Sequence, residues 1–269
     1  MGEPLVSIIM GVYNGADTIE RCVNSILSQT YNNWEFIICD DCSTDNTYFI
    51  LKEIQKNDDR ILLLRNKKNK RLAATLNECL AHAKGKYIAR MDADDESMPK
   101  RLEKQVKFLE ENPEYAVVGT ARYIVAGEKI KGIRKGYEIP DKRILLKDVP
   151  HAHPTIMMRQ EAYRILGGYT ESKDTMRAED LDLWIRFYAK GYRGYNIQEP
   201  LYRYMESVGD YKKRNLVAAV YTSKVFLRGY KILKFPIYQY VFAMKPIISA
   251  ILSSAFMYRY HARKLDEVQ

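Results

Sequence analysis

Cysteine is scarce in this sequence of 269 residues. The four cysteines are Cys22, Cys39, Cys42 and Cys79. Cys39 and Cys42 make a single Cys-x-x-Cys spacing, whereas a zinc knuckle needs two, and the pair Asp40–Asp41 between them disfavours thiolates. We therefore expect four reduced thiols in a cytoplasmic protein, with neither a disulfide framework nor a zinc site.

A glycine-rich phosphate loop is also missing. No Gly-x-Gly-x-x-Gly motif follows the first apolar run, Leu5–Val12, which ends in Tyr13, Asn14 and Gly15. Dinucleotide-binding folds use those glycines to bring backbone amides to a pyrophosphate, so their absence disfavours such a fold. We expect no signal peptide, because Met1–Pro4 leads straight into the apolar run. Internal repeats and low-complexity segments are lacking too, which disfavours a repeat architecture.

The composition is that of a globular protein. Hydrophobic residues make up 46% and charged residues 29% of the chain, and the length fits one large α/β domain or one domain with an appendage. The formal net charge is +9, and the excess of basic residues lies after about residue 185. This balance is compatible with nucleic acid, acidic lipid or phosphate-bearing substrates.

Apolar runs typical of buried strands alternate with amphipathic helices in the first third of the chain. The predicted strands are Leu5–Val12, Trp34–Cys39, Ile61–Leu64 and Tyr87–Met91. The predicted helices begin after Asp17 or Thr18, at Thr47 and at Leu72, and Gly85 is expected to end the third in a left-handed conformation. Short connections of this kind indicate right-handed βαβ units and a parallel sheet covered on both faces. Ligands of such sheets bind beyond the carboxyl ends of the strands.

Four acidic residues follow the fourth predicted strand. They are Asp92, Asp94, Asp95 and Glu96. Carboxylates crowded at a strand end repel one another unless a cation or a set of donors lies between them. If the strand geometry persists, Asp92 and Asp94 point the same way and offer oxygen ligands to Mg²⁺ or Mn²⁺, completed by substrate phosphate and water. The pattern therefore predicts a divalent-metal site that holds a diphosphate.

The acidic cluster has two other possible interpretations, a helix cap and an EF-hand. Asp95 also suits the N-terminus of a following helix, where a carboxylate caps the chain and favours the positive end of the dipole, and this alternative stays open. An EF-hand is rejected, because Ser97 takes the place of the required glycine and Pro99 disrupts the loop.

The rest of the chain predicts further strands and helices. Helices are expected over Lys100–Glu111 and from Ala178, with Trp184 in the core, and strands over 116–118, 122–125, 155–158, 192–195 and 201–204. Residues 127–136 are predicted to be a basic, turn-rich loop. We expect one domain over about residues 1–205, with a nucleotide-binding half to about 98 and an acceptor half from 99, followed by a separate helical region over 206–269.

Five segments of the chain together resemble glycosyltransferase family 2. They are Val6–Asn14, Asp40–Asp45, Ala89–Asp95, His153–Thr155 and Glu179–Trp184. Each is weak alone, but their order and spacing are specific, and the resemblance spans roughly Val6–Arg203. It implies the GT-A fold, a Rossmann-like, mostly parallel sheet flanked by helices. It also implies a nucleotide-sugar donor, a glycan or lipid-linked acceptor, and inversion at the anomeric carbon.

The resemblance assigns roles to individual residues. Asp180 is the implied general base with Glu179 as runner-up, and Asp94 and Asp92 are the implied ligands of Mn²⁺ or Mg²⁺. The implied donor-binding residues are Tyr13, Asn14, Asp41, Arg71, Asp92, Asp94 and His153. The sequence departs from the family where Cys42 and Arg71 stand, since glycine is usual at or near both positions. Cys42 would alter the loop beside the base, and Arg71 would narrow the pocket or reach a phosphate.

Two of these residues have structural alternatives. Asp180 begins a predicted helix, so Asp180 and Glu179 are either catalytic or N-terminal caps. His153 is either a satisfied core imidazole or a donor near the diphosphate, and His151 is more readily structural.

The C-terminal region is basic and aromatic. A helix is predicted over Tyr211–Leu233, and the apolar stretch Phe235–Tyr258 is interrupted by Lys245 and Pro246. It is either a helical cap on the catalytic domain or, the reading we favour, an interfacial helix pair on an anionic membrane surface. That surface would suit a polyprenyl-diphosphate-linked acceptor. Nucleic acid is not expected, because the aromatic residues lie in apolar runs rather than among the basic ones.

These patterns lead to one expected function and two alternatives. We expect a metal-dependent, inverting hexosyl- or N-acetylhexosaminyltransferase that uses a UDP-sugar in surface polysaccharide synthesis, peripheral on the inner face of the cell membrane. A non-catalytic nucleotide-sugar-binding protein stays open. A nucleotidyltransferase is disfavoured, because it normally shows a glycine-rich, basic loop where Tyr13–Ala16 stands.

Overall fold

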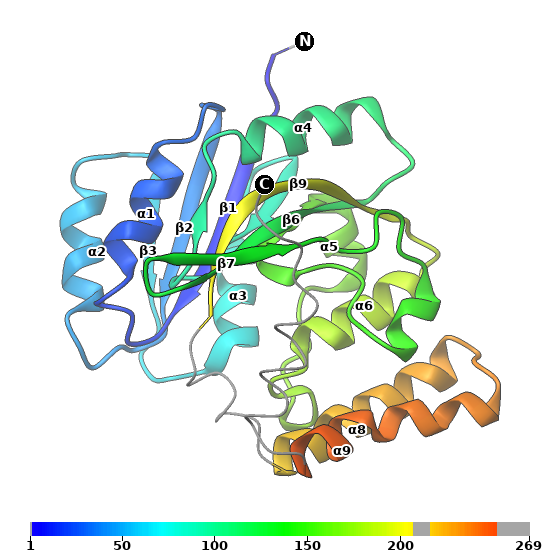
Figure 1. Ribbon diagram of the computed structural model, residues 1–269. Helices are drawn as coiled ribbons and strands as arrows, with labels where there is room; N and C mark the ends of the chain where they lie inside the picture. The colour runs from blue at the N-terminus through cyan, green and yellow to red at the C-terminus, as the bar shows by residue number, and fades with distance from the viewer. Residues whose placement is uncertain (1, 207–215, 252–269) are drawn as a thin grey trace.

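The computed structural model describes residues 2–206 and 216–251, and a mixed sheet of nine strands forms its centre (Figure 1). The strand order is β3-β2-β1-β4-β8-β6-β9-β5, and β7 pairs with β6 outside that path. The strands are β1 (Val6–Val12), β2 (Trp34–Asp40), β3 (Ile61–Arg65), β4 (Tyr87–Arg90), β5 (Glu96–Ser97), β6 (Val117–Ala126), β7 (Lys129–Arg134), β8 (Met157–Arg159) and β9 (Gly194–Met205). The predicted α/β class is confirmed.

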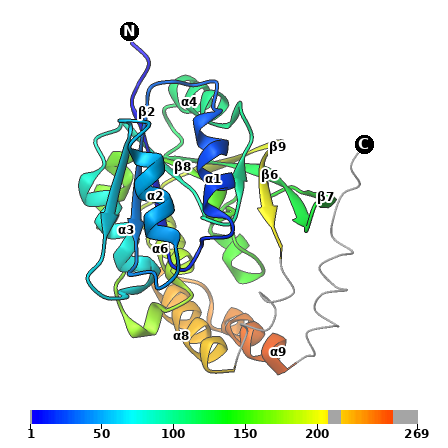
Figure 2. The ribbon, with the colours of Figure 1, turned by 90° about the vertical axis from the view of Figure 1, so that its left-hand side faces the viewer.

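Helices cover both faces of the sheet (Figures 1 and 2). The α-helices are α1 (Ile19–Leu27), α2 (Thr47–Gln55), α3 (Arg71–His82), α4 (Arg101–Glu111), α5 (Gln160–Leu166), α6 (Glu179–Ala189), α8 (Leu216–Ile232) and α9 (Lys245–Ile251). The 3₁₀ helices are η1 (Lys142–Leu146), η2 (His153–Thr155), η3 (Lys173–Thr175) and η4 (Ile237–Met244). Ile8 packs in the cluster with α1, α2 and α4, whereas Ile9 packs in the cluster with α3, α5, α6 and α8. Burial on both faces explains why β1 is apolar throughout.

The first four strands are parallel and end at one edge of the sheet. β1 lies between β2 and β4, with Val12 beside Asp40 and Ile9 beside Arg90. The segments that follow these three strands therefore leave from the same edge. This is the place where open α/β sheets bind ligands.

The second half of the sheet is mixed, and its strands are longer than predicted. The predicted strands 116–118 and 122–125 form the single strand β6, and 192–195 and 201–204 form β9. Register shifts interrupt the parallel pairing of β6 with β9, which explains why each strand looked divided in the sequence. The strand predicted from Thr155 begins at Met157, because the preceding residues form η2.

The predicted loop over residues 127–136 is wrong. Lys129–Arg134 forms the edge strand β7, which makes a hairpin with β6 through Gly127, a residue in the left-handed region at φ 63°. Charged residues on an edge strand prevent pairing with other chains, and the same charges give the segment the sequence pattern of a loop.

The expected left-handed C-terminal cap at Gly85 is also wrong. Helix α3 ends at His82, and Ala83 is already extended. Glycine is needed at position 85 because a Cβ atom there would lie 2.5 Å from the backbone nitrogen of Ser7. The reason for this glycine is a close approach between segments far apart in the sequence, which no local pattern reveals.

The C-terminal helices α8 and α9 pack at the end of the molecule away from α4, with α8 against α6 (Figures 1 and 2). Helix α8 lies against α6 so closely that a Cβ at Gly229 would be 2.3 Å from Ile185 Cδ1. Helix α8 thus packs as in the alternative of a helical cap, and the membrane contact stays a prediction. Residues 211–215 and 252–258 of the predicted helices lie outside the described residues. Among the described helices, none has the length and apolar character that a membrane span requires.

Candidate active site

Three neighbouring cavities border the start of α6. The first, of about 610 Å³, lies over Tyr13, Asp41 and Arg71. The second, of about 490 Å³, shares Arg177 and Glu179 with the first. The third, of about 470 Å³, is mostly apolar and runs between η1, α6, α8 and α9.

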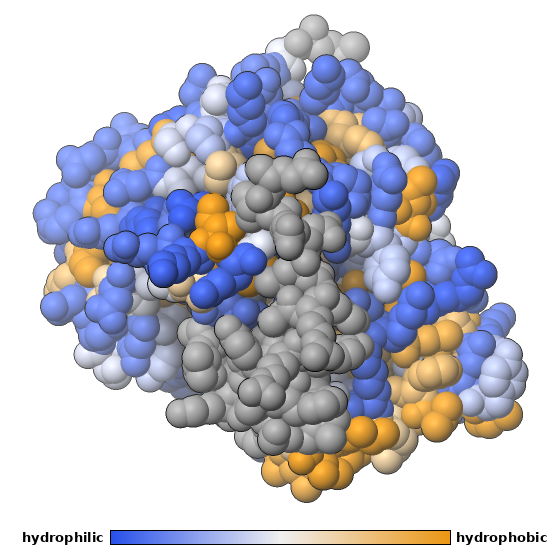
Figure 3. Space-filling view, viewed as in Figure 1, coloured by the Kyte–Doolittle hydropathy of each residue, from blue (hydrophilic) through white to orange (hydrophobic). Residues whose placement is uncertain are grey.

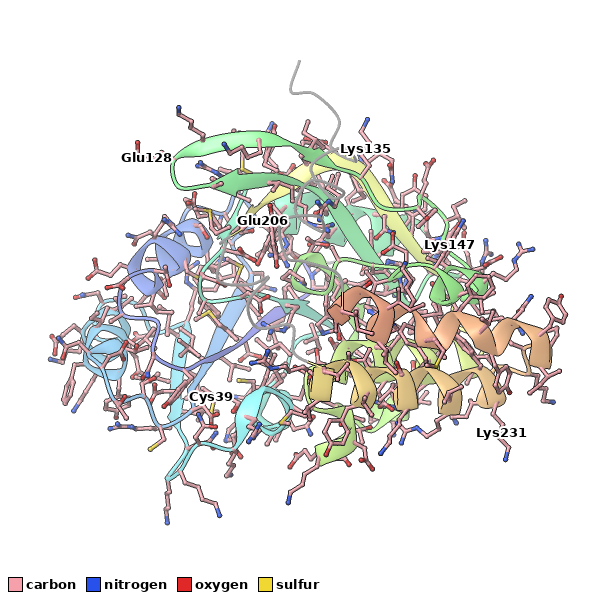
Figure 4. All side chains as sticks on the ribbon, turned by 60° about the horizontal axis from the view of Figure 1, so that its bottom comes forward. Cys39, Glu128, Lys135, Lys147, Glu206 and Lys231 are labelled. Atoms are coloured by element: carbon pink, nitrogen blue, oxygen red, sulfur yellow. The ribbon has the colours of Figure 1, made fainter. Side chains whose placement is uncertain are left out.

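Asp180 borders the second and third of these cavities. Figure 4 shows Glu206, which lines the second cavity, beneath the β6–β7 hairpin whose turn bears Glu128. The junction of the three cavities is thus built from the segment Arg177–Asp180 at the N-terminus of α6.

Asp41 lies at the base of the first cavity and holds the loop that precedes α3. Its carboxylate accepts hydrogen bonds from the backbone nitrogens of Lys70 and Arg71 and from Asn66 Nδ2, each 2.8 Å long. A carboxylate has about four acceptor positions, so the loop occupies most of them and leaves room for a further donor. Tyr13, with 49% of its surface exposed, lies on the wall of the same cavity.

Both positions at which the sequence departs from the family have left-handed backbone. Cys42 has φ 63° and Arg71 has φ 70°. Glycine adopts these angles without steric cost, which is a physical reason for its usual presence at such positions. The Arg71 side chain borders the first cavity and contacts the sulfur of Met176 across it.

Asn14 and Asp94 line none of the three cavities. Asn14, at φ 52°, ties the loop after β1 to the loop after β2: its Oδ1 accepts from Thr44 N at 2.9 Å, and its own nitrogen donates to Ser43. Asp94 is exposed, and its backbone carbonyl accepts from Arg21 at 3.0 Å.

Asp92 borders the second cavity, paired with a buried arginine. Arg90 is only 2% exposed, and its guanidinium lies 2.6 Å from Asp92 Oδ1. Because β4 ends at Arg90, the strand alternation assumed for Asp92 and Asp94 does not extend to them.

Asp95 is the buried member of the acidic cluster. Its Oδ1 accepts from Met205 N at 2.8 Å, whereas Oδ2 is buried without a hydrogen-bond partner. Burial, followed by the charges of Asp92 and Asp94, raises the pKa of Asp95 well above its usual range. Arg90 pairs with Asp92, and Arg21 and Arg203 pair with Glu96, so the remaining repulsion acts on Asp95, where a nearby cation would favour the charged form.

The acidic cluster fits a metal ion that is held mainly by substrate. Among residues 2–206 and 216–251, no group of three or more His, Cys, Asp or Glu side chains is arranged to hold an ion. Mg²⁺ and Mn²⁺ are often bound by one or two carboxylates together with phosphate and water, so a complete protein cage is not required. The residues at hand suit such a site, with Asp94 exposed to solvent and Asp92 already paired.

Asp180 and Glu179 are the first residues of α6 that face the cavities. Burial raises the pKa of both carboxylates, and Asp180 raises that of Glu179 further. Asp180 Oδ1 accepts from Leu181 N at 2.9 Å, which leaves its second oxygen for other partners. The N-cap position is Ala178, so neither acid serves as a standard N-cap.

His153 combines features of both predicted roles. Its Nε2 lies 2.7 Å from the Tyr169 hydroxyl, whereas Nδ1 is buried without a partner. Burial and the charge of Arg90 lower the pKa of His153 well below its usual range, so the ring is neutral. His151 is structural: it bonds Asn196 at 2.8 Å, and burial lowers its pKa to about 4.

Asp182 is an important residue that the sequence analysis missed. This buried carboxylate accepts from Thr170 at 2.6 Å, from Arg186 at 2.8 Å and from Arg228 of α8. It therefore connects the helix that starts with Asp180 to the C-terminal helices. The i,i+4 spacing of Asp182 and Arg186 was the only signal in the sequence.

The family model described as Glycosyl transferase family 2 matches residues 7–166, which is more than half of the chain. The chain belongs to glycosyltransferase family 2. The putative glycosyltransferase EpsE of Bacillus subtilis (strain 168) is 46% identical over 263 residues, covering 97% of this chain and 95% of EpsE. WfaP of Escherichia coli, a UDP-Glc:alpha-D-GlcNAc-diphosphoundecaprenol beta-1,3-glucosyltransferase, is 34% identical over 201 residues, covering 74% of this chain and 77% of WfaP.

Solved structures confirm the expected GT-A fold. TarS 1-349 of S. aureus in complex with UDP has a TM-score of 0.67 at 20% identity, covering 95% of this chain and 77% of that one. The mannosyltransferase PcManGT from Pyrobaculum calidifontis, in complex with GDP-Man and Mn²⁺, has a TM-score of 0.65 at 19% identity, covering 97% and 80%. These likenesses show the fold, and the family membership makes this protein a glycosyltransferase.

Proposed function

We propose that this glycosyltransferase moves a hexosyl or N-acetylhexosaminyl group from a UDP-sugar to a lipid-linked saccharide, with a divalent ion and inversion of the anomeric carbon. The main support is the position of Asp180, a half-buried carboxylate of raised pKa that lines both the second and the third cavity. A base is most effective when its pKa approaches the working pH, and burial shifts Asp180 in that direction.

The donor is assigned to the first cavity. Its volume suits a nucleotide sugar, and its wall contains the aromatic ring of Tyr13 and the remaining acceptor capacity of Asp41. The UDP of TarS and the UDP-Glc in the name of WfaP favour uridine as the base. Arg71, on the same wall, is available for the diphosphate.

The metal ion is assigned to Asp94, with Asp92 as a second ligand, and the Mn²⁺ of PcManGT supports this choice. When bound, such an ion stabilises the negative charge of a departing nucleoside diphosphate. Arg90 holds Asp92 from the buried side, and neutral His153 lines the second cavity with its Nδ1 buried and unpaired. The charge of Arg90 is taken up by its ion pair with Asp92, and His153 is uncharged.

Asp180 is assigned the role of general base, which takes the proton of the acceptor hydroxyl. The hydroxyl oxygen attacks the anomeric carbon, the bond from that carbon to the donor phosphate breaks, and the proton passes to the carboxylate. Glu179, which faces the first and second cavities, is the runner-up base. A single displacement of this kind inverts the anomeric centre.

A lipid-linked acceptor and a membrane surface are assigned to the C-terminal region, residues 206–269, which we propose to be a helical appendage packed on a catalytic domain over 1–205. The third cavity leads from Asp180 to an apolar space between α8 and α9. Figure 3 shows apolar surface along the edge formed by these helices. The name of WfaP contains a diphosphoundecaprenol acceptor. We propose peripheral attachment to the cytoplasmic face of the membrane.

A thermal-shift screen tests the site. UDP-, GDP-, CMP- and dTDP-sugars are added with and without Mn²⁺, and we expect UDP-sugars with Mn²⁺ to raise the melting temperature. Asp94→Ala should lose the part of the shift that depends on Mn²⁺, whereas Asp180→Asn should keep the shift and lose sugar transfer. Asp59→Ala, a change at an exposed acid on the loop after α2, is the matched control.

Two outcomes would overturn the assignment. One is that no nucleotide shifts the melting temperature, and the other is that Asp94→Ala keeps the Mn²⁺-dependent shift. A protein that binds donor and neither transfers nor hydrolyses it would instead be the non-catalytic binding protein, for which Asp180→Asn changes nothing.

A further inference from the structure

Two arginines lie directly opposite each other in the β6–β7 hairpin. In the register of the two strands, Arg122 pairs with Arg134. Like charges at directly opposed positions of an antiparallel pair destabilise a sheet. Both side chains are half-buried, and both line the second cavity together with Asp180. The hairpin thus bears an electrostatic cost beside the proposed base.

No direct ion pair within the described chain neutralises this arginine pair, although the more distant charges of Asp148 and Asp95 favour the charged form of Arg122. Neither guanidinium has an ion pair or a hydrogen bond with any residue of 2–206 or 216–251; Arg122 only faces the ring of Tyr204, at 5.8 Å from its centre. Burial, followed by the charge of Arg134, lowers the pKa of Arg122 to about 10, so it remains charged at neutral pH. Four acids lie on the same cavity wall: Asp92, which pairs with Arg90, and Glu179, Asp180 and Glu206, none of which forms an ion pair with Arg122 or Arg134 among the described residues.

The second cavity is on the acceptor side of the base. Neither arginine lines the first cavity, where the donor is assigned. The second and third cavities share Asp180, Arg177 and Val149, so a molecule can reach both polar arginines and the apolar space between α8 and α9. Planar guanidinium groups bind phosphate and carboxylate through paired hydrogen bonds.

We propose that Arg122 and Arg134 form an anion site that selects an acidic acceptor, one with a phosphate or a carboxylate next to the sugar that receives the new linkage. The proposal rests on the proposed function, because it takes Asp180 as the base and the first cavity as the donor site. The two arginines are specificity-determining residues, and the anion they bind would offset their mutual repulsion.

Binding to the full chain, with UDP and Mn²⁺ already present, tests the proposal by calorimetry. Three probes share one decyl chain: decyl diphosphate, decyl glucuronide and neutral decyl glucoside, all used below their micelle concentrations. We expect one or both anionic probes to bind more tightly than the glucoside. Arg122→Gln and Arg134→Gln should each weaken that binding roughly ten- to a hundredfold, since hydrogen bonds to charged groups are involved. Arg122→Lys should keep part of it.

Matched controls separate the anion site from general charge. Lys129→Gln and Lys131→Gln remove exposed charges from the same hairpin and should leave binding of all probes unchanged. The melting temperature of the arginine variants should not fall by more than a few degrees, because a like-charge pair is removed. Their affinity for UDP should equal that of the wild type.

The result of each arm is decisive. Preference for the diphosphate identifies a diphosphate-linked acceptor, and preference for the glucuronide identifies an acidic sugar. The proposal is overturned if the anionic probes bind no better than the glucoside, if the arginine variants bind them normally, or if the lysine variants lose as much. Failure of the wild type to bind UDP would overturn the donor assignment instead, and the arginine dependence is then measured without UDP.

Discussion

Single residues in left-handed conformation distinguish this chain at the edge of the sheet. Cys42 and Arg71 have positive φ angles at places where the family usually has glycine. A left-handed conformation costs a residue with a Cβ atom about 1–2 kcal/mol. The loops after β2 and before α3 therefore contain strain. Asp41 joins the two loops, because it is the first residue of the loop after β2 and accepts hydrogen bonds from backbone nitrogens of the loop before α3.

This strain predicts a stabilising substitution at Cys42. We expect Cys42→Gly to have a free energy of unfolding about 0.5 to 1 kcal/mol higher than Cys42→Ala, because relief of the strain exceeds the extra chain entropy of glycine. Both variants lose the thiol, so the comparison isolates the backbone. Urea denaturation followed by circular dichroism measures the difference, and equal stabilities would contradict the strain.

At the residue scale, the sequence indicated which residues line the cavities better than it indicated which contacts those residues make. Asp180, Asp92 and His153, which the family resemblance singled out, do line one cavity. The sequence did not indicate that Asp41 mainly bonds its own loop. Nor did it indicate the pairing of Arg122 with Arg134, because that pairing depends on the register of a hairpin with an irregularity between Ile124 and Val125.

At the element scale, the contact of α6 with α8 connects the base to the C-terminal helices. Asp182 accepts hydrogen bonds from Arg186 of its own helix and from Arg228 of α8. Asp180 and Asp182 belong to the first turn of the same helix. A change in the packing of α8 should therefore shift the base relative to the acceptor.

Removal of Arg228 tests this connection. We expect Arg228→Ala to lower the free energy of unfolding by about 1 kcal/mol, a modest loss because the arginine is half-exposed and Asp182 keeps two other donors. The kcat should fall several-fold while the affinity for UDP stays normal, since the first cavity is untouched. Lys231→Ala, a change at an exposed residue near the end of α8 (Figure 4), is the control and should leave kcat unchanged.

The same scale shows why half of the sheet was predictable. Strands β1, β2 and β4 are buried on both faces or nearly so, and their continuous apolar runs stand out in the sequence. Strand β7 lies at an edge and pairs only with β6. Its lysines give it the sequence pattern of a loop, so it was not predicted as a strand. Glycine is required at position 85 by the close approach of the Ser7 backbone, and a contact between distant segments leaves no local signal in the sequence.

At the scale of the whole molecule, the three cavities form a series of neighbours, from the polar cavities that we assign to donor and base to the apolar cavity beside α8 and α9. The cavities pass from the edge of the parallel sheet, through the start of α6, to the space between α8 and α9. An amphipathic acceptor matches this arrangement, because its polar head would lie in the second cavity and its long apolar tail in the third. This correspondence is the physical basis for assigning a membrane surface to the C-terminal helices.

The exposed apolar side chains of η4 allow that assignment to be tested. Ile237 is 78% and Val241 66% exposed, and burial of each in a lipid interface is worth about 1.5 to 3 kcal/mol. We therefore expect the double variant Ile237→Ser with Val241→Ser to lose more than tenfold in partitioning to anionic liposomes, measured by co-sedimentation. Phe49→Ser on α2, where the side chain is 63% exposed, is the matched control. An equal loss in both proteins, or none in the double variant, would place the membrane contact elsewhere.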